Sequence, residues 1–385
     1  MNRNKLELYV HIPFCIKKCD YCDFLSAPAS LDVQQEYVKR LTEEIKQKAD
    51  NYQAYSVPSI FIGGGTPSVL PISSIDVIMK ALSTHFKLED AAEITIECNP
   101  GTLDEDKVKF YKKVGINRIS FGLQSAIDEE LNVLGRIHTW EQFLKSFALV
   151  REAGFDNVNV DLMYGLPNQS LKDWIYSITQ VVRLNPEHIC AYSLIIEEGT
   201  NFFKRYQEDE KAREKGDVPV SLPEEETERR MCEHATIFLR ENGYEQYEIS
   251  NYAKPGKSCK HNIGYWTRQP YLGLGLGSAS LVENRRFTNT ANLEDYLKGD
   301  FGKKDCETLS EKSQMEEFMF LGLRLLRGVD RQEFKKQFSV EIEHIYGEVL
   351  VTLSKQELLR QIDGRIWLTT KGISISNYAM AQFLL

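Results

Sequence analysis

Short runs of apolar and β-branched residues alternate with longer amphipathic segments along the first half of the chain. The runs have the length of buried strands, which are expected at Leu6–Ile12, Ser59–Gly63, Glu93–Glu97, Arg118–Gly122, Asn157–Met163 and His188–Leu194. Between them, apolar residues recur every three or four positions. This spacing predicts helices over Val33–Lys48, Ile75–Phe86, Asp104–Val114, Trp140–Ala153 and Leu171–Val182.

This alternation defines the expected fold class. Strands separated by helices pair in parallel through βαβ crossovers, so the chain is expected to be an α/β protein. A closed TIM barrel needs eight such units, and the runs above supply only six. The pattern therefore favours an incomplete parallel (β/α)6 barrel, although a doubly wound parallel sheet would give the same alternation.

The chain changes character after the sixth strand. Segment Lys204–Glu226 is dense in charge with little apolar periodicity, which is typical of a solvated linker. A helix over Thr227–Asn242 and a short strand at Tyr247–Ile249 are expected next. We therefore divide the chain into a barrel core, a charged linker with an accessory αβ segment, and a C-terminal helical cap, at residues 1–200, 201–309 and 310–385.

The C-terminal cap is expected to resemble a winged helix. A helix at Gln356–Arg360, a tight turn at Asp363-Gly364-Arg365 and a strand at Ile366–Leu368 have the order of a helix that leads into a β-wing. Winged helices often bind DNA, but this chain has a net charge of -9 and no dense basic stripe. The cap is therefore expected to be structural or to bind a protein partner, and no nucleic acid is expected.

Length and composition fit a soluble globular protein with more than one structural unit. The 385 residues are 42% hydrophobic and 27% charged. No apolar run reaches the roughly 18–20 residues of a membrane span, and the first residues hold no apolar signal segment. We expect a cytoplasmic protein whose 8 cysteines are reduced rather than paired in disulfides.

Three of the cysteines, Cys15, Cys19 and Cys22, lie close together in sequence. Iron–sulfur clusters usually take four thiolates, so three at this C-x3-C-x2-C spacing can hold a [4Fe–4S] cluster and leave one iron open. An open iron can chelate the amino and carboxylate groups of S-adenosylmethionine. A structural zinc site would need a fourth ligand, for which only His11 is near in sequence; a chance grouping is the third alternative.

Further candidate residues lie towards the ends of the expected strands or just after them, where parallel barrels place their sites. The glycine-rich run Gly63-Gly64-Gly65-Thr66-Pro67 would let a ligand approach the backbone closely. Carboxylate, amide and guanidinium groups nearby can bind the polar groups of a cofactor, and an aromatic ring can cover its adenine. These candidates are Tyr9, Tyr21, Glu97, Gln124, Arg136 and Asp161. The alternatives for each are a salt bridge, a strand-end cap or a place in the core.

A second unusual motif is His261-Asn262-Ile263-Gly264-Tyr265-Trp266, which precedes a run of spaced glycines. A histidine beside aromatic residues can be an axial ligand of haem. Taken alone, such a histidine is more often a hydrogen-bonded structural residue. Cys259, two residues before His261, is another thiol that could ligate haem iron.

The cysteine and glycine-rich motifs resemble the radical S-adenosylmethionine superfamily. More narrowly, the run from Tyr9 to Cys15, Gly63–Pro67, Gly122-Leu123-Gln124, and Asp161 followed by Gly165-Leu166-Pro167 resemble the oxygen-independent coproporphyrinogen III oxidase family. The resemblance covers roughly residues 6–384. It is specific in the first 200 residues and looser in the last 75.

Two features separate the chain from the oxidases of that family. Oxidases carry a further cysteine just after the trio, whereas Cys22 is followed here by Asp23 and Phe24. Oxidases also carry a long N-terminal extension, and only 14 residues precede Cys15 here. The motif from His261 to Trp266 resembles instead the haem-chaperone branch of the family.

The resemblance implies a radical-SAM barrel, a [4Fe–4S] cluster on the cysteine trio and S-adenosylmethionine as its exchangeable ligand. Matching positions imply that S-adenosylmethionine contacts Tyr9, Gly64, Glu97, Gln124, Arg136 and Asp161. They imply that a second such molecule, as in the oxidases, contacts Tyr21, Gly65 and Thr66. They also imply that haem binds at His261.

The function that this branch implies is a haem chaperone, which takes up haem and passes it to recipient haem proteins. Membrane-bound respiratory enzymes are the expected recipients, which would place the protein peripherally at the membrane, and a homodimer is an expected assembly. The rival function is that of the oxidases, the radical oxidative decarboxylation of porphyrinogen propionates to vinyl groups.

Overall fold

The computed structural model describes residues 4–385. Its first six strands lie side by side in the order of the sequence and pair in parallel. They are β1 (Glu7–Ile12), β2 (Ser56–Gly64), β3 (Lys87–Cys98), β4 (Arg118–Gln124), β5 (Val158–Tyr164) and β6 (His188–Ser193). The predicted parallel α/β architecture with six strand units is thus confirmed.

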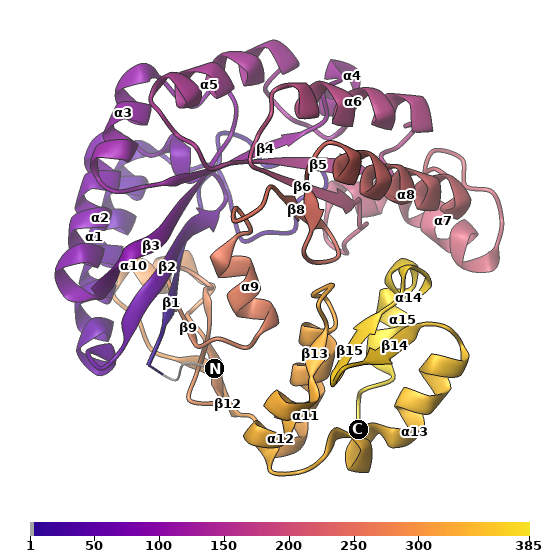
Figure 1. Cartoon of the computed structure of the whole chain (residues 1–385). Coiled ribbons are helices and arrows are strands. Elements are labelled where there is room, and N and C mark those ends of the chain that lie inside the picture. The colour runs from indigo at the N-terminus through magenta and orange to yellow at the C-terminus, as the bar shows by residue number, and fades with distance from the viewer. Residues whose placement is uncertain (1–3) are drawn as a thin grey trace.

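Helices connect these strands and cover the outer face of the curved sheet (Figure 1). They are α1 (Leu31–Ala49), η1 (Asp50–Tyr52), η2 (Pro67–Val69), α2 (Ile72–His85), α3 (Glu105–Lys113), α4 (Asp128–Val133), α5 (Trp140–Glu152) and α6 (Leu171–Arg183). Each long helix buries one face; in α6, for example, Trp174, Ile178 and Val181 are buried. Ser170 caps α6 reciprocally with Asp173, which fixes where the helix begins.

Within residues 4–385 the sheet does not close into a ring. On one side β9 (Tyr271–Leu274) pairs in parallel with β1, and antiparallel strands follow it. On the other side β6 pairs with β8 in antiparallel orientation. The remaining strands of this sheet are β7 (Glu245–Gln246), β8 (Asn251–Ala253), β10 (Ala279–Val282), β11 (Arg285–Thr288) and β12 (Lys304–Thr308). The strand order therefore has two ends, β12 and β7, which confirms an incomplete barrel.

The two faces of the barrel strands differ in chemistry. Side chains alternate between faces along a strand; thus Ile60 and Ile62 of β2 join the apolar core under the helices. Residues at the intervening positions of neighbouring strands are buried but polar: Glu7, Ser59, Thr95, Arg118, Asn159 and His188. The barrel interior is therefore lined with polar groups whose hydrogen-bond partners must come from the interior itself.

The charged segment that was expected to be a solvated excursion or linker is largely helical, and most of its residues are exposed or half-exposed. It forms α7 (Asn201–Lys215), followed by α8 (Glu225–Glu241). Only two residues of α7 are buried, Phe202 and Asp209, which explains why no apolar period is visible in the sequence. Phe202 packs into a small core beside the barrel, and Asp209 accepts hydrogen bonds from three successive backbone N–H groups, at 220–222. The strand expected at Tyr247–Ile249 is wrong, because that segment is the bend between β7 and β8.

The C-terminal unit has a core of its own. Its elements are α11 (Glu311–Gly322), β13 (Val329–Asp330), α12 (Arg331–Phe338), α13 (Ile342–Lys355), β14 (Leu359–Ile362), β15 (Arg365–Leu368), α14 (Thr370–Ser374) and α15 (Ser376–Ala381). The β14–β15 hairpin turns at Asp363-Gly364, both with positive φ, and is the predicted wing. The helix expected at Gln356–Arg360 is wrong, because α13 ends at Lys355 and Glu357 takes a left-handed conformation.

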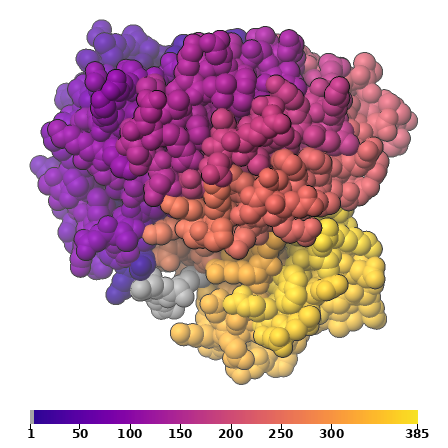
Figure 2. Space-filling model, turned by 45° about the horizontal axis from the view of Figure 1, so that its top comes forward, coloured from indigo at the N-terminus to yellow at the C-terminus, as the bar shows by residue number. Residues whose placement is uncertain are grey.

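Two short helices remain, α9 (Lys260–Trp266) and α10 (Leu293–Leu297). Helix α9 lies between the open side of the barrel and the C-terminal unit (Figure 1). Figure 2 shows the C-terminal unit, in yellow, packed against the orange segment that follows the six barrel strands. A buried ion pair joins them, in which Glu317 of α11 binds Arg268 at 2.8 Å and also contacts Arg286. Among residues 4–385, none of the helices is both long and apolar enough to cross a membrane.

Candidate functional site

The three clustered cysteines lie in the loop between β1 and α1, and all three are free, partly exposed thiols. Backbone hydrogen bonds close this loop: Cys15 N–H donates to the Ala27 carbonyl at 3.2 Å, and Ala27 N–H donates to the Pro13 carbonyl at 2.9 Å. Asp20 N–H donates to the Leu134 carbonyl at 3.1 Å, which ties the loop to the end of α4. The loop is therefore held over the C-terminal ends of the barrel strands.

His11 supports this loop from below rather than joining the cysteines. Its Nε2 lies 2.9 Å from the Leu25 carbonyl and its Nδ1 lies 3.0 Å from the Tyr9 hydroxyl. Burial lowers its pKa, which favours the neutral ring. Within residues 4–385, no three His, Cys, Asp or Glu side chains converge so as to hold a single metal ion. Both ring nitrogens of His11 already have partners in the protein, which disfavours His11 as the fourth ligand of a zinc site.

A cavity of about 320 Å³ opens beside the cysteines at the C-terminal ends of the strands. Of the residues predicted from the sequence, those that line it are Cys15, Cys19, Tyr21, Cys22, Gly64, Gly65, Thr66, Glu97, Gln124, Arg136 and Asp161. The predicted candidates outside its lining are Tyr9 and His261. Residues 15 to 161, drawn from five strand–helix units, thus meet at one edge of the sheet, as expected for a parallel barrel.

The glycines leave room that side chains would fill. A Cβ at Gly65 would lie 2.7 Å from the Phe14 carbonyl oxygen and 2.9 Å from Cys15 Sγ. Gly64 has a φ of +116°, a conformation that favours glycine, and its N–H donates to Glu97 Oε2 at 3.0 Å. The glycine-rich loop therefore packs against the cysteine loop and orients the Glu97 carboxylate.

Two half-buried carboxyl groups face the same cavity. Burial, and then the charge of Asp161, raise the pKa of Glu97 to about 8. Burial raises the pKa of Asp161 to about 6, opposed by a hydrogen bond from Asn159 Nδ2 at 2.7 Å. An ammonium group brought beside Glu97 would compensate its charge. The site is therefore suited to a ligand that carries a positively charged amine.

Gln124 and two unpredicted residues, Asn99 and Tyr192, also line the cavity. Gln124 is buried with a φ of +81°, strain of a kind that non-glycine residues keep mainly at functional sites. Its Oε1 accepts a hydrogen bond from the Tyr192 hydroxyl at 2.8 Å. Asn99 joins Thr66 to Arg136 through hydrogen bonds of 2.9 and 2.7 Å. The sequence signal for Asn99 was its place after Glu97 at a strand end; Tyr192 carried no comparable signal.

These residues fit an iron–sulfur cluster and S-adenosylmethionine. Three free thiols on one loop are the donor set of a cluster with an open iron. The cavity beside them combines exposed glycine backbone, two carboxyl groups and the Arg136 guanidinium. Such groups match the amine, the hydroxyls and the carboxylate of S-adenosylmethionine.

His261 lies elsewhere, near the N-terminal ends of the strands. On α9, its Nδ1 is 3.0 Å from Ser59 Oγ and its Nε2 is 3.1 Å from the Tyr265 hydroxyl. Its ring stacks on Phe61, and burial lowers its pKa to about 3. Both ring nitrogens thus have partners inside the protein. Haem ligation by His261 stays a prediction.

Tyr9 lies between the two regions. Its ring stacks on Phe61 at 6.4 Å, its hydroxyl faces His11, and burial followed by the charge of Glu97 raises its pKa. The layer formed by these aromatic side chains therefore separates the cavity from His261. Contact of Tyr9 with a cofactor stays a prediction.

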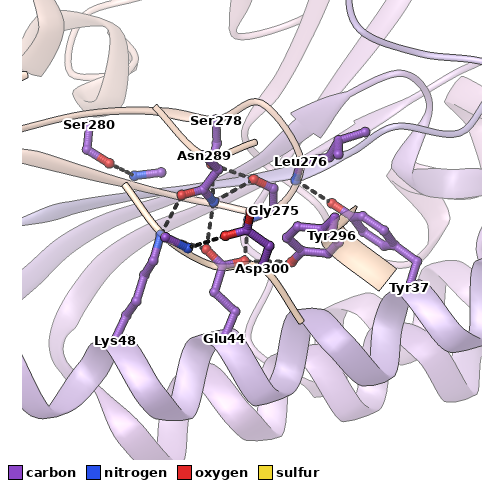
Figure 3. A network of polar contacts seen from close by, with 12 residues as sticks. Tyr37, Glu44, Lys48, Gly275, Leu276, Ser278, Ser280, Asn289, Tyr296 and Asp300 are labelled. Carbon is purple, nitrogen blue, oxygen red and sulfur yellow. Dashed lines mark hydrogen bonds and ion pairs between the residues drawn. The ribbon is translucent and has the colours of Figure 1, made fainter. Parts of the chain in front are cut away.

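A buried polar network supports the cysteine loop from the outer side (Figure 3). Glu44 of α1 accepts hydrogen bonds from Gly275 N–H at 2.8 Å and from the Tyr296 hydroxyl at 2.6 Å, and it pairs with Lys48 at 2.8 Å. The Tyr37 hydroxyl donates to the His11 carbonyl at 2.8 Å and accepts from Leu276 N–H at 2.9 Å. The network thus joins α1, the end of β1 and the glycine-spaced run after β9.

Fold and site together define a radical-SAM barrel followed by a HemN-type C-terminal domain. The model of the Radical SAM superfamily matches residues 9–180, and that of the HemN C-terminal domain matches residues 309–375. The solved structure of coproporphyrinogen III oxidase (HemN) from Escherichia coli, described as a radical SAM enzyme, aligns with a TM-score of 0.84. It covers 99% of this chain and 90% of that one at 23% identity, a level that shows the shared fold.

Relatives of higher sequence identity show which family within this class the chain belongs to. "Heme chaperone HemW" of Lactococcus lactis is 36% identical over 98% of this chain and 97% of that protein. "Heme chaperone HemW" of Bacillus subtilis is 35% identical over 98% of each. The chain belongs to the HemW family. Membership of the radical SAM superfamily implies a [4Fe–4S] cluster and S-adenosylmethionine.

Proposed function

We propose that this protein is a haem chaperone, which binds haem and delivers it to recipient haem proteins. The observation that carries the proposal is the near full-length similarity to proteins named heme chaperone HemW, at 34–36% identity in organisms as distant as Bacillus subtilis and Haemophilus influenzae. The recipients are proposed to be membrane-bound respiratory haem proteins, reached from the cytoplasm, and the chaperone is proposed to act as a homodimer.

The cluster and S-adenosylmethionine are proposed to occupy the cavity beside the cysteine loop. Cys15, Cys19 and Cys22 would hold the cluster. Gly64, Glu97, Gln124, Arg136 and Asp161 would contact S-adenosylmethionine, which is supported by their place on one cavity wall. When bound, these groups supply one-electron chemistry, and we propose that they regulate haem loading.

The residues of the site have separate tasks in this proposal. The Gly64 N–H orients the Glu97 carboxylate, so that the carboxylate can receive an ammonium group. Since burial raises the pKa of Glu97 to about 8, an incoming cation would displace its proton near neutral pH. Asp161, held by Asn159, is placed to accept hydrogen bonds from hydroxyl groups. The residues of the cavity wall would therefore hold the cofactor in position and would take no part in its chemistry.

The proposal is tested against the oxidase alternative in one anaerobic experiment. Reconstituted protein is incubated with haem and, separately, with coproporphyrinogen III, reductant and S-adenosylmethionine. We expect stoichiometric haem uptake and no vinyl product. Steady formation of protoporphyrinogen would overturn the proposal in favour of the oxidase function.

The place of haem binding is tested with His261→Ala. His344→Ala is the matched control, because His344 is an exposed histidine of α13. We expect loss of haem affinity only in the first variant, with far-UV circular dichroism unchanged. Equal affinity in both variants would remove His261 from the haem site and would leave the chaperone proposal standing.

A further inference from the structure

A chain of hydrogen bonds joins the side chains of Cys15 and Cys19 across the mouth of the barrel. Thr66 Oγ1 lies 3.7 Å from Cys15 Sγ, within reach of an O–H···S hydrogen bond. On the other side, Arg136 Nη1 lies 3.4 Å from Cys19 Sγ. Asn99 stands between these two donors, 2.9 Å from Thr66 Oγ1 and 2.7 Å from Arg136 Nη2. It touches neither sulfur, yet it connects the groups that do.

The guanidinium fixes the direction of every bond in this chain. Arginine has donors only, so the amide atom of Asn99 that faces Arg136 must be the oxygen. The Nδ2 amine then faces Thr66 and donates to its hydroxyl oxygen. The single hydroxyl hydrogen of Thr66 is left to point at Cys15 Sγ. Removal of the Asn99 side chain would free both donors to turn away from sulfur.

The surrounding backbone holds Asn99 in this position. Its N–H donates to Ser68 Oγ at 3.2 Å, and its carbonyl accepts from the Thr102 hydroxyl at 2.6 Å. Gly122 makes room for the amide, because a Cβ there would lie 3.1 Å from Asn99 Oδ1 and 3.3 Å from Arg136 Nη2. The Gly122 carbonyl also accepts a hydrogen bond from Arg136 Nη2. The arrangement is therefore held in place by protein atoms alone.

We propose that Asn99 is a positioning residue that sets the reduction potential of the cluster by aiming Thr66 and Arg136 at two of its three thiolates. Hydrogen bonds to ligand sulfurs help to set cluster potentials. They stabilise the reduced, more negative state and so raise the potential. The inference rests on the proposed cluster site, because it takes Cys15 and Cys19 as cluster ligands.

The test is an anaerobic redox titration of Asn99→Ala, followed by electron paramagnetic resonance. Iron and sulfide are assayed first, so that only assembled cluster is compared. We expect near-parental iron content and a midpoint potential shifted to a more negative value. The matched control is Asn132→Ala, which changes an exposed asparagine of α4 and should leave the potential unchanged.

A second variant separates positioning from a general structural role. Thr66→Val keeps the shape of the side chain and removes the hydroxyl donor to Cys15. Because Asn99 acts partly through Thr66, the shift in the double variant should be smaller than the sum of the two single shifts. If Asn99→Ala retains too little iron to titrate, the test is the shift of the midpoint potential in the single variant Thr66→Val.

Three outcomes would contradict the inference or the cluster site on which it rests. An unchanged potential in Asn99→Ala, or in Thr66→Val where that variant carries the test, overturns the positioning role while the cluster site stands. A Cys15→Ala protein that still holds a cluster with parental iron content and spectrum overturns the cluster site itself. Fully additive shifts in the double variant also contradict the inference, because they would mean that Asn99 and Thr66 act independently.

Discussion

Replacement of Glu44 by leucine should destabilise the protein strongly. Glu44 is fully buried, and it is paired with Lys48, of which only 8% is exposed. It also accepts hydrogen bonds from Gly275 N–H, Tyr296 Oη and Asn289 Nδ2 at 2.8, 2.6 and 2.6 Å (Figure 3). The change removes the acceptor for all of them and leaves the Lys48 ammonium in the core with only the Asn289 amide oxygen, at 2.6 Å.

The expected loss of stability follows from the burial of the Lys48 ammonium. Loss of one partner from a buried ion pair costs about 3–5 kcal/mol, because the other charge is left uncompensated. Each buried donor without an acceptor adds about 1–3 kcal/mol in isolation, but rearrangement and water entry make these contributions less than additive. We therefore expect the free energy of unfolding to fall by about 4 kcal/mol in Glu44→Leu.

The assay is urea unfolding of the cofactor-free protein, followed by far-UV circular dichroism. Glu43→Leu is the matched control, because Glu43 is the preceding residue of α1 and pairs with Arg40 at the exposed surface. Its unfolding midpoint should stay close to that of the parent. The double variant Glu44→Leu/Lys48→Met should recover much of the loss, since both charges then leave the core together.

Two results would refute this reasoning. A Glu44→Leu midpoint equal to that of Glu43→Leu would mean that the buried network contributes nothing to stability. A double variant as unstable as the sum of its single variants would mean that Glu44 and Lys48 are not coupled.

Three further predictions follow from burial and close packing. Burial raises the pKa of Glu97 from 4.5 to about 8, so between these pH values the folded state keeps a proton that the unfolded chain has released. In unfolding titrations of the cofactor-free protein, the parent should therefore lose stability as pH rises from about 4.5 to 8, and Glu97→Gln should lose less. Equal slopes of stability against pH in the two proteins would contradict this. Gly65→Ala should lower the iron content after reconstitution, because its Cβ would meet the Phe14 carbonyl at 2.7 Å, whereas Gly347→Ala, in open space on α13, should retain parental iron. Glu317→Ala leaves the buried Arg268 without its partner and should reduce the free energy of unfolding by about 3–5 kcal/mol. We expect faster limited proteolysis between the barrel and the C-terminal unit. An unchanged cleavage rate would argue against this link.

The alternation of strands and helices could be predicted because it depends on local patterns of apolar and polar residues. Buried parallel strands are short apolar runs, and the helices between them show a three-to-four-residue period. The gathering of Glu97 and Asp161 at one edge could also be predicted, because parallel strands bring their carboxyl ends to the same side of the sheet. The cysteine trio could be predicted as a metal site from its spacing alone, because its three members lie in one loop.

Local patterns failed where a few contacts fix an element. Helix α7 has no helical signal in the sequence, because its contact with the protein rests on Phe202 and Asp209, which leaves no apolar stripe to detect. The helix predicted at Gln356–Arg360 is wrong because α13 already ends at Lys355, and the left-handed conformation of Glu357 has no distinct sequence signal. Such features depend on what the rest of the chain places beside them.

The sequence by itself determined the parallel barrel, the cysteine loop and the ring of polar residues around it. Only the tertiary structure decided that Asn99 links Thr66 to Arg136, that Glu44 meets Gly275, and that His261 lies buried away from the cavity. The physical reason is that hydrogen bonds between distant segments depend on packing and strand register. A shift of one residue along a strand would turn each of its side chains to the opposite face.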